Sequence, residues 1–184
     1  INLKMFLFVY GTLRKGFPGE MAQKLSTEAE WIGKALLQNA KLYRVHWENF
    51  HFDYPALVLI DEKATDKSDN FVVGDLVHLK NAEQSIKWLD AYEECGEQFN
   101  QPNEYIRKEV TVQLMTDQEA SQNFLASTYV YGWPIKDSDG NFVAPVREIV
   151  VAGDWLKFVQ KNIENYADKP LIHPHVRPSH PSLL

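Results

Sequence analysis

Short apolar runs separated by glycine, proline and polar segments dominate the hydrophobic pattern of this chain. The apolar runs cover residues 3–10, 55–60, 71–79 and 126–133. Runs of this length that end at turn residues are typical of buried strands. The segment 105–115 alternates apolar and polar residues at its far end, as a half-buried strand does, and 31–45 has a mixed pattern that suits one or two strands. The pattern therefore predicts a chain built largely of strands.

Three segments have the spacing or the capping residues of helices: 20–30, 81–95 and 155–166. Asn81 and Asp154 each stand where the first turn of a helix needs a side-chain acceptor. Four prolines after residue 168 prevent regular structure, so we expect residues 167–184 to form an extended tail.

The irregular alternation of strands with a few helices favours an α+β fold over a doubly wound sheet. Gly33 and Gly74 fall inside predicted strands, where glycine allows a bulge or close packing and helps a small sheet to curl. A chain of 184 residues suits one domain with a sizeable core. We predict a single domain over residues 1–166, built on a small, mixed, mostly antiparallel β-barrel with a few flanking helices, and followed by the tail.

The first apolar run stops at Gly11, and this turn is the first candidate for chemistry. Glycine allows either a positive φ or a very close approach of another group. The turn would then present the amides of Thr12 and Leu13 outward, as a seat for a carboxylate or an oxyanion. It is not a phosphate-binding P-loop, because no Gly-Lys-Ser/Thr follows. On these residues alone, a strand that ends in a simple turn is the more economical interpretation.

The second candidate is Glu93, near the end of the predicted helix 81–95. At 100° per residue it falls between Ile86 and Leu89, at the centre of the apolar face. A carboxylate there is costly unless it is paired or opens into a pocket, although the last helical turn could also simply overhang solvent. Glu94 and, more modestly, Asp90 point away from this stripe, and we expect both to be solvated.

Composition and charge narrow the classes of function. A formal net charge of −6 argues against a general nucleic-acid-binding protein, which needs a basic surface. No apolar run reaches transmembrane length, and residues 3–10 are too short for the core of a signal peptide. We therefore expect no nucleic-acid or membrane partner and a cytoplasmic location.

Cysteine and histidine usage points to neither a disulfide nor a metal. The single cysteine, Cys95, excludes an internal disulfide and a cysteine-rich zinc site. Two glutamates precede it and should raise its pKa, which would leave the thiol inert. His173, His175 and His180 could hold a metal, but a proline-rich tail rarely preorganises such a site, so we expect none.

Five segments, in order along the chain, form a distinctive set. The first is the run Val9-Tyr-Gly-Thr-Leu-Arg-Lys-Gly16. The other four are Tyr54-Pro-Ala-Leu-Val, Val73-Gly-Asp-Leu-Val, Leu89-Asp-Ala-Tyr-Glu93 with Tyr105-Ile-Arg107, and Ala152-Gly-Asp-Trp155. Together they resemble the gamma-glutamylcyclotransferase superfamily in its AIG2-like and gamma-glutamylamine cyclotransferase branch, and the first run looks like the signature of that superfamily. The resemblance extends over roughly residues 5–158. In place of the Asn-His that relatives acting on gamma-glutamylamines tend to have after the first turn, this chain has Gly19-Glu20.

The resemblance implies a barrel-like α+β fold with a cavity at the first turn. It implies that Glu93 is the acid/base residue, the same residue that the helical stripe singles out. It further implies that Tyr10, Gly11, Thr12 and Leu13 form the ligand-binding loop. Tyr105 would close the pocket or only pack beside it.

The implied reaction is the cyclisation of a gamma-glutamyl amine or amino acid to 5-oxoproline, with release of an amine. Ring closure is intramolecular and needs proton transfer but no metal or nucleotide, so we expect no cofactor. The alternative is a non-catalytic binding module that uses the same cavity for a carboxylate-bearing metabolite or a peptide end. Glu93 favours the enzyme, because a module that binds anions gains nothing from a buried carboxylate.

Overall fold

A computed structural model describes residues 4–48, 53–61, 70–116 and 122–160 of the chain. Strands and helices follow in the order β1 (Met5–Val9), α1 (Glu20–Glu28), β2 (Ala29–Gln38), β3 (Ala40–Val45), β4 (Tyr54–Leu59), β5 (Phe71–Leu79), α2 (Ala82–Tyr92), β6 (Tyr105–Leu114), β7 (Gln122–Tyr131), β8 (Val146–Ile149), a short 3-10 turn (Val151–Gly153) and α3 (Trp155–Val159). The predicted tail, the three tail histidines and the part of the last predicted helix beyond residue 160 lie outside the described residues.

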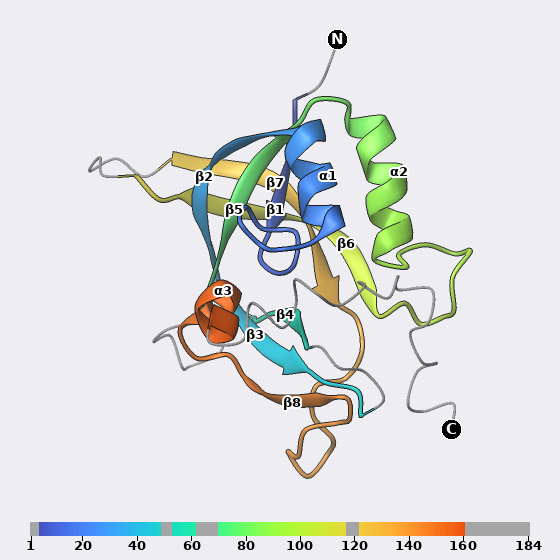
Figure 1. Ribbon diagram of the computed structural model, residues 1–184. Helices are drawn as coiled ribbons and strands as arrows, with labels where there is room; N and C mark the ends of the chain where they lie inside the picture. The colour runs from blue at the N-terminus through green and yellow to red at the C-terminus, as the bar shows by residue number, and fades with distance from the viewer. Residues whose placement is uncertain (1–3, 49–52, 62–69, 117–121, 161–184) are drawn as a thin grey trace.

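Five strands form a closed barrel in the order β1-β5-β2-β6-β7 (Figure 1). Neighbouring strands run antiparallel, except that β1 and β7 close the barrel as a parallel pair through Leu7 and Ser127. The register of β2 against β5 shifts between Trp31 and Gly33, which confirms the predicted bulge. The predicted α+β class, with a mixed and mostly antiparallel barrel, is confirmed.

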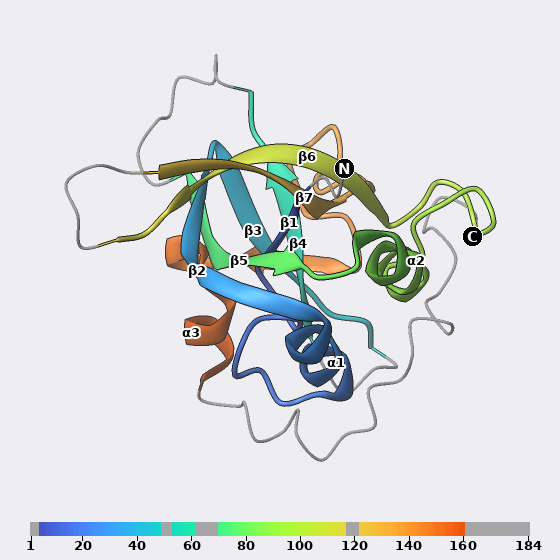
Figure 2. The same ribbon diagram turned by 90° about the horizontal axis from the view of Figure 1, so that it is seen from above.

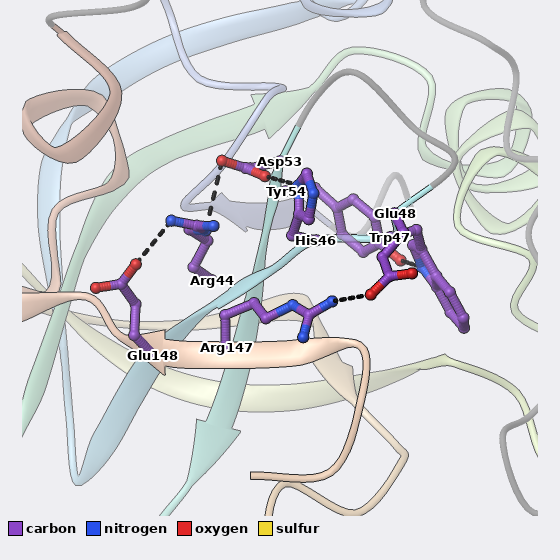
Figure 3. Close-up of polar contacts among 8 residues, drawn as sticks. All are labelled: Arg44, His46, Trp47, Glu48, Asp53, Tyr54, Arg147 and Glu148. Carbon is purple, nitrogen blue, oxygen red and sulfur yellow. Dashed lines mark hydrogen bonds and ion pairs between the residues drawn. The ribbon is translucent and has the colours of Figure 1, made fainter.

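A second, three-stranded sheet in the order β4-β3-β8 lies beside the barrel, below it in Figure 1. Arg44 of β3 forms ion pairs with Asp53, the residue before β4, and with Glu148 of β8 (Figure 3). The hydrophobic pattern does not predict β8, in which only Val146 is buried.

The helices flank the barrel on two sides. Figures 1 and 2 place α1 and α2 on one side and α3 on the other. The carboxylate of Glu28 joins the first two, because its Oε2 accepts hydrogen bonds from Ser85 Oγ (3.0 Å) and Trp88 Nε1 (2.7 Å). Side chains of Asn81 and Asp154 cap α2 and α3, as predicted. The predicted helix 81–95 is too long, because α2 ends at Tyr92.

Strand β1 is buried on both faces, as its continuous apolar run predicts. Phe8 belongs to one hydrophobic cluster, which includes Trp155 of α3. Leu7 and Val9 belong to a second cluster, which includes Leu89 of α2. The turn that follows β1 therefore starts at the point where the barrel, the helices and the second sheet meet.

Candidate active site

The turn after β1, residues 11–14, is a hydrogen-bonded β-turn, and we call it the β1 turn. The Arg14 amide donates to the Gly11 carbonyl oxygen (3.1 Å). The Thr12 and Leu13 amides occupy the two central positions and take no part in that bond. Neither of them donates to any group in the described part of the chain. These two adjacent amides are the candidates for binding a carboxylate.

Glycine is needed at position 11 because another chain segment approaches closely. A Cβ built on Gly11 would lie 2.5 Å from Cγ of Pro55 in β4. The sequence leaves two roles open for this glycine, a positive φ or a close approach of another group. Gly11 does not have a positive φ, so its role is to allow the close approach of Pro55. The preceding residue is also fixed, since the buried Tyr10 hydroxyl donates to the Tyr129 carbonyl oxygen (2.6 Å).

We expect Gly11→Ala to weaken carboxylate binding at the β1 turn. The added methyl group would overlap Pro55, so the turn must move away from it. Overpacking of this kind costs about 1–3 kcal/mol. A displacement that removes about 1.4 kcal/mol of binding free energy raises Kd tenfold. Calorimetric titration with 5-oxoproline measures this. The double variant Gly11→Ala with Pro55→Ala removes the contact and should recover most of the affinity; no recovery would show that Gly11 matters for another reason.

A buried arginine holds the β1 turn from behind. Arg14 is only 1% exposed, and its guanidinium contacts Asp75 of β5 (Nε to Oδ2, 3.4 Å) and Asp154 at the start of α3 (Nη1 to Oδ1, 2.8 Å). The Lys15 amide also donates to Asp75 Oδ2 (2.9 Å). Sequence analysis names Asp154 only as a helix cap and does not single out Arg14 or Asp75, although each of the three lies inside one of the segments that carry the family resemblance.

The end of α2 forms the other side of the site. Glu93 is the C-cap residue, half-buried, and its amide still donates to the Leu89 carbonyl oxygen (2.9 Å). Glu94 follows in the left-handed region (φ 51°). Its amide donates to Ala91 (3.3 Å) and that of Cys95 to Asp90 (2.8 Å), which is the Schellman pattern of helix ends. A non-glycine residue at this position costs of order 1–3 kcal/mol, so the surrounding contacts must hold the turn in place.

Asp90 is not the solvated side chain that its place on the helix predicts. Its carboxylate accepts two hydrogen bonds from the Arg107 guanidinium of β6, from Nε (2.9 Å) and Nη2 (3.3 Å), and a third from the Tyr129 hydroxyl of β7 (2.7 Å). Burial, followed by the bond to Asp90, raises the pKa of Tyr129 far above its usual range. Tyr129 also packs in the core.

One contact between hydroxyl groups joins the β1 turn to the end of α2. The Thr12 and Tyr92 hydroxyls lie 3.3 Å apart, which brings the β1 turn to the last residue of α2, next to Glu93. The Tyr105 hydroxyl donates to the carbonyl oxygen of Pro55 (2.8 Å), the proline that Gly11 contacts. Tyr10, Gly11, Thr12, Leu13, Glu93 and Tyr105 are therefore gathered in one region of the molecule.

Aromatic side chains and a buried carboxylate adjoin this region at Tyr105. Glu104 is 3% exposed, and its carboxylate accepts a hydrogen bond from the Tyr54 hydroxyl (2.7 Å). Trp47 Nε1 donates to the same hydroxyl (2.6 Å), and Figure 3 shows both aromatic residues at the base of the segment between β3 and β4. The Tyr105 ring packs against Tyr54 at a centroid distance of 6.5 Å.

Cys95 has a raised pKa, as predicted, but burial is its largest cause. The charges of Asp90 and Glu93 raise it further, whereas the Arg107 amide, which donates to Sγ (3.4 Å), lowers it. Among the described residues no group of histidine, cysteine or acidic side chains could hold a metal ion. No helix in the same residues is long and apolar enough to cross a membrane.

The family model for gamma-glutamyl cyclotransferase, AIG2-like, matches residues 7–157. Among solved structures, the chain is similar to YkqA from Bacillus subtilis, with 23% identity and a TM-score of 0.51 over 88% of this chain and 43% of that one. It is also similar to an AIG2-like protein from Mus musculus, with 21% identity and a TM-score of 0.50 over 80% of this chain and 88% of that one. No curated protein matches the chain. These structures share its fold, and the family match confirms the resemblance seen in the sequence: the chain belongs to the gamma-glutamyl cyclotransferase, AIG2-like family.

Proposed function

We propose that this protein is a gamma-glutamylcyclotransferase-like enzyme, which cyclises a small gamma-glutamyl amine or amino acid and releases 5-oxoproline and an amine. The observation that carries the proposal is the contact between the β1 turn and the end of α2. It links the turn that contains the Thr12 and Leu13 amides to Tyr92, the residue before the half-buried Glu93. With a single cysteine the chain needs no oxidising compartment, and we place the activity in the cytoplasm.

In the proposed complex the Thr12 and Leu13 amides bind the α-carboxylate of the substrate. This bond fixes one end of the gamma-glutamyl group, and the rest folds back so that the α-nitrogen reaches the side-chain amide carbonyl. Holding two reacting groups of one molecule in this geometry accounts for a large part of the rate in such reactions. Tyr105 would close the same site beside Pro55.

Glu93 carries the proton in this scheme. Its carboxylate takes a proton from the α-ammonium group, and the free amine attacks the amide carbonyl carbon to form the five-membered ring. Glu93 returns this proton to the leaving nitrogen as the bond from that carbon to the nitrogen breaks. It then passes a second proton from the ring nitrogen to the released amine, which departs as an ammonium ion. One carbon–nitrogen bond forms and one breaks, so the reaction consumes no water and needs no metal or nucleotide.

A panel of gamma-glutamyl amines and gamma-glutamyl amino acids tests the proposal. The purified protein should release 5-oxoproline and the free amine in equal amounts from at least one of them. In water enriched in oxygen-18 the 5-oxoproline should carry no label, whereas hydrolysis would give labelled glutamate. Binding of 5-oxoproline without turnover of any compound would contradict the enzyme and favour the binding module.

A further inference from the structure

Arg107 contacts the chain on both sides of Glu93. Its guanidinium binds the carboxylate of Asp90, three residues before Glu93, and its amide donates to Sγ of Cys95, two residues after it. Tyr129, which supplies the third hydrogen bond to Asp90, is the direct partner of Arg107 in the β6–β7 ladder. Side chains of directly paired residues extend from the same face of a sheet. Two adjacent strands of the barrel thus hold the segment 90–95 at both ends.

These side-chain contacts lie at the C-terminal end of α2, where the chain leaves the helix. Helix ends have fewer backbone hydrogen bonds than helix interiors and open more readily. Glu93 is the last residue before the left-handed Glu94, so local strain also favours release of this turn. A two-pronged bond between arginine and carboxylate fixes orientation as well as distance.

We propose that Asp90, Arg107 and Tyr129 are positioning residues, which hold Glu93 in place against the β1 turn. The inference rests on the proposed function insofar as Glu93 is the proton shuttle there. It adds three residues that bind no substrate and affect the reaction only by keeping Glu93 in position.

None of the three is suited to carry the proton itself. The carboxylate oxygens of Asp90 already accept three hydrogen bonds, two of them from a cation. Tyr129 stays protonated because burial and Asp90 raise its pKa far above its usual range. Arginine does not lose its proton in proteins.

Turnover by four variants separates positioning from general support of the fold. Asp90→Asn breaks the two-pronged bond but leaves an acceptor for Tyr129, and a base displaced by about 1 Å costs roughly 10²-fold in rate. We expect kcat to fall by about 10- to 100-fold, with KM little changed. Arg107→Lys, which keeps the charge but not the fork, should fall between Asp90→Asn and wild type. In a Glu93→Gln background, Asp90→Asn should have almost no further effect, because nothing remains to be positioned. An equal loss in both backgrounds would overturn the proposal.

Amide hydrogen exchange tests the same proposal without any turnover. The amides of Glu93, Glu94 and Cys95 bond to carbonyl groups of α2, and Asp90→Asn should speed their exchange about tenfold or more while the strands of the barrel stay protected. The matched control is Glu83→Gln, which breaks the exposed pair with Lys87 on the same helix and should change neither exchange nor kcat. If no compound is turned over, the proposed function fails, and this measurement alone decides the role of the network. Unchanged exchange at residues 93–95 in Asp90→Asn would overturn it.

Discussion

Replacing Arg14 by methionine should lower the free energy of unfolding by about 3–5 kcal/mol, because removal of one partner from a buried ion pair leaves the other charge unpaired. The side chains of Asp75 and Asp154 are only 4% and 8% exposed, so water cannot replace the lost guanidinium. For a chain of this size the loss corresponds to a melting temperature lower by roughly 6–20 °C. Thermal and urea unfolding followed by circular dichroism measure both quantities.

Arg44 gives a matched control for this experiment. It also lies between two carboxylates, those of Asp53 and Glu148, but its side chain is 28% exposed (Figure 3). Exposed ion pairs contribute about 0–1 kcal/mol, so Arg44→Met should melt close to wild type. Adding Asp75→Asn and Asp154→Asn to Arg14→Met removes the unpaired charges and should recover most of the loss. An Arg14→Met protein that melts within 2 °C or so of wild type would mean that solvent reaches the two carboxylates.

Local patterns predict the barrel well because its strands carry their own signals. β5 is predicted over its full length, and the bulge in β2 is predicted from Gly33. In the second sheet, β3 and β4 correspond to predicted strand segments, but the third strand could not be predicted in this way. This strand, β8, has one buried residue, Val146, and is a strand only because it pairs with β3, about a hundred residues earlier in the chain. Such pairing depends on the assembled fold and leaves no mark on the hydrophobic pattern.

The site shows the same division between local and distant causes. Helical periodicity singles out Glu93, because its neighbours on the stripe lie within two turns. It assigns Asp90 to solvent, because the partners that bind its carboxylate, Arg107 and Tyr129, lie 17 and 39 residues away. Arg14 is missed for a related reason, since an arginine in a turn is ordinarily exposed and both of its partners are distant. Asp90, Arg107 and Arg14 are charged residues inside the segments of family resemblance, and that position could have marked them as candidates. Tyr129 lies outside those segments.

Glu93→Gln should lower the turnover of an active gamma-glutamyl substrate by about 10²–10⁴-fold, the usual contribution of a general base. Glutamine keeps the shape of the side chain and can still form hydrogen bonds, but it cannot accept a proton at neutral pH. Because Glu93 is only half-buried, we expect the stability to stay within about 1 kcal/mol of wild type. Steady-state release of 5-oxoproline gives the rate, and thermal unfolding checks the fold.

Two comparisons make the result specific to the proton. Glu94→Gln changes the adjacent carboxylate without altering the backbone at its left-handed position, and it should leave turnover near wild type. Affinity for 5-oxoproline should also survive in Glu93→Gln, because in the proposed complex the carboxylate binds the Thr12 and Leu13 amides, which the variant does not touch. Loss of affinity and rate together would assign Glu93 to binding. Turnover by Glu93→Gln at the wild-type rate would contradict the assignment. It would show that a group other than Glu93 carries the proton.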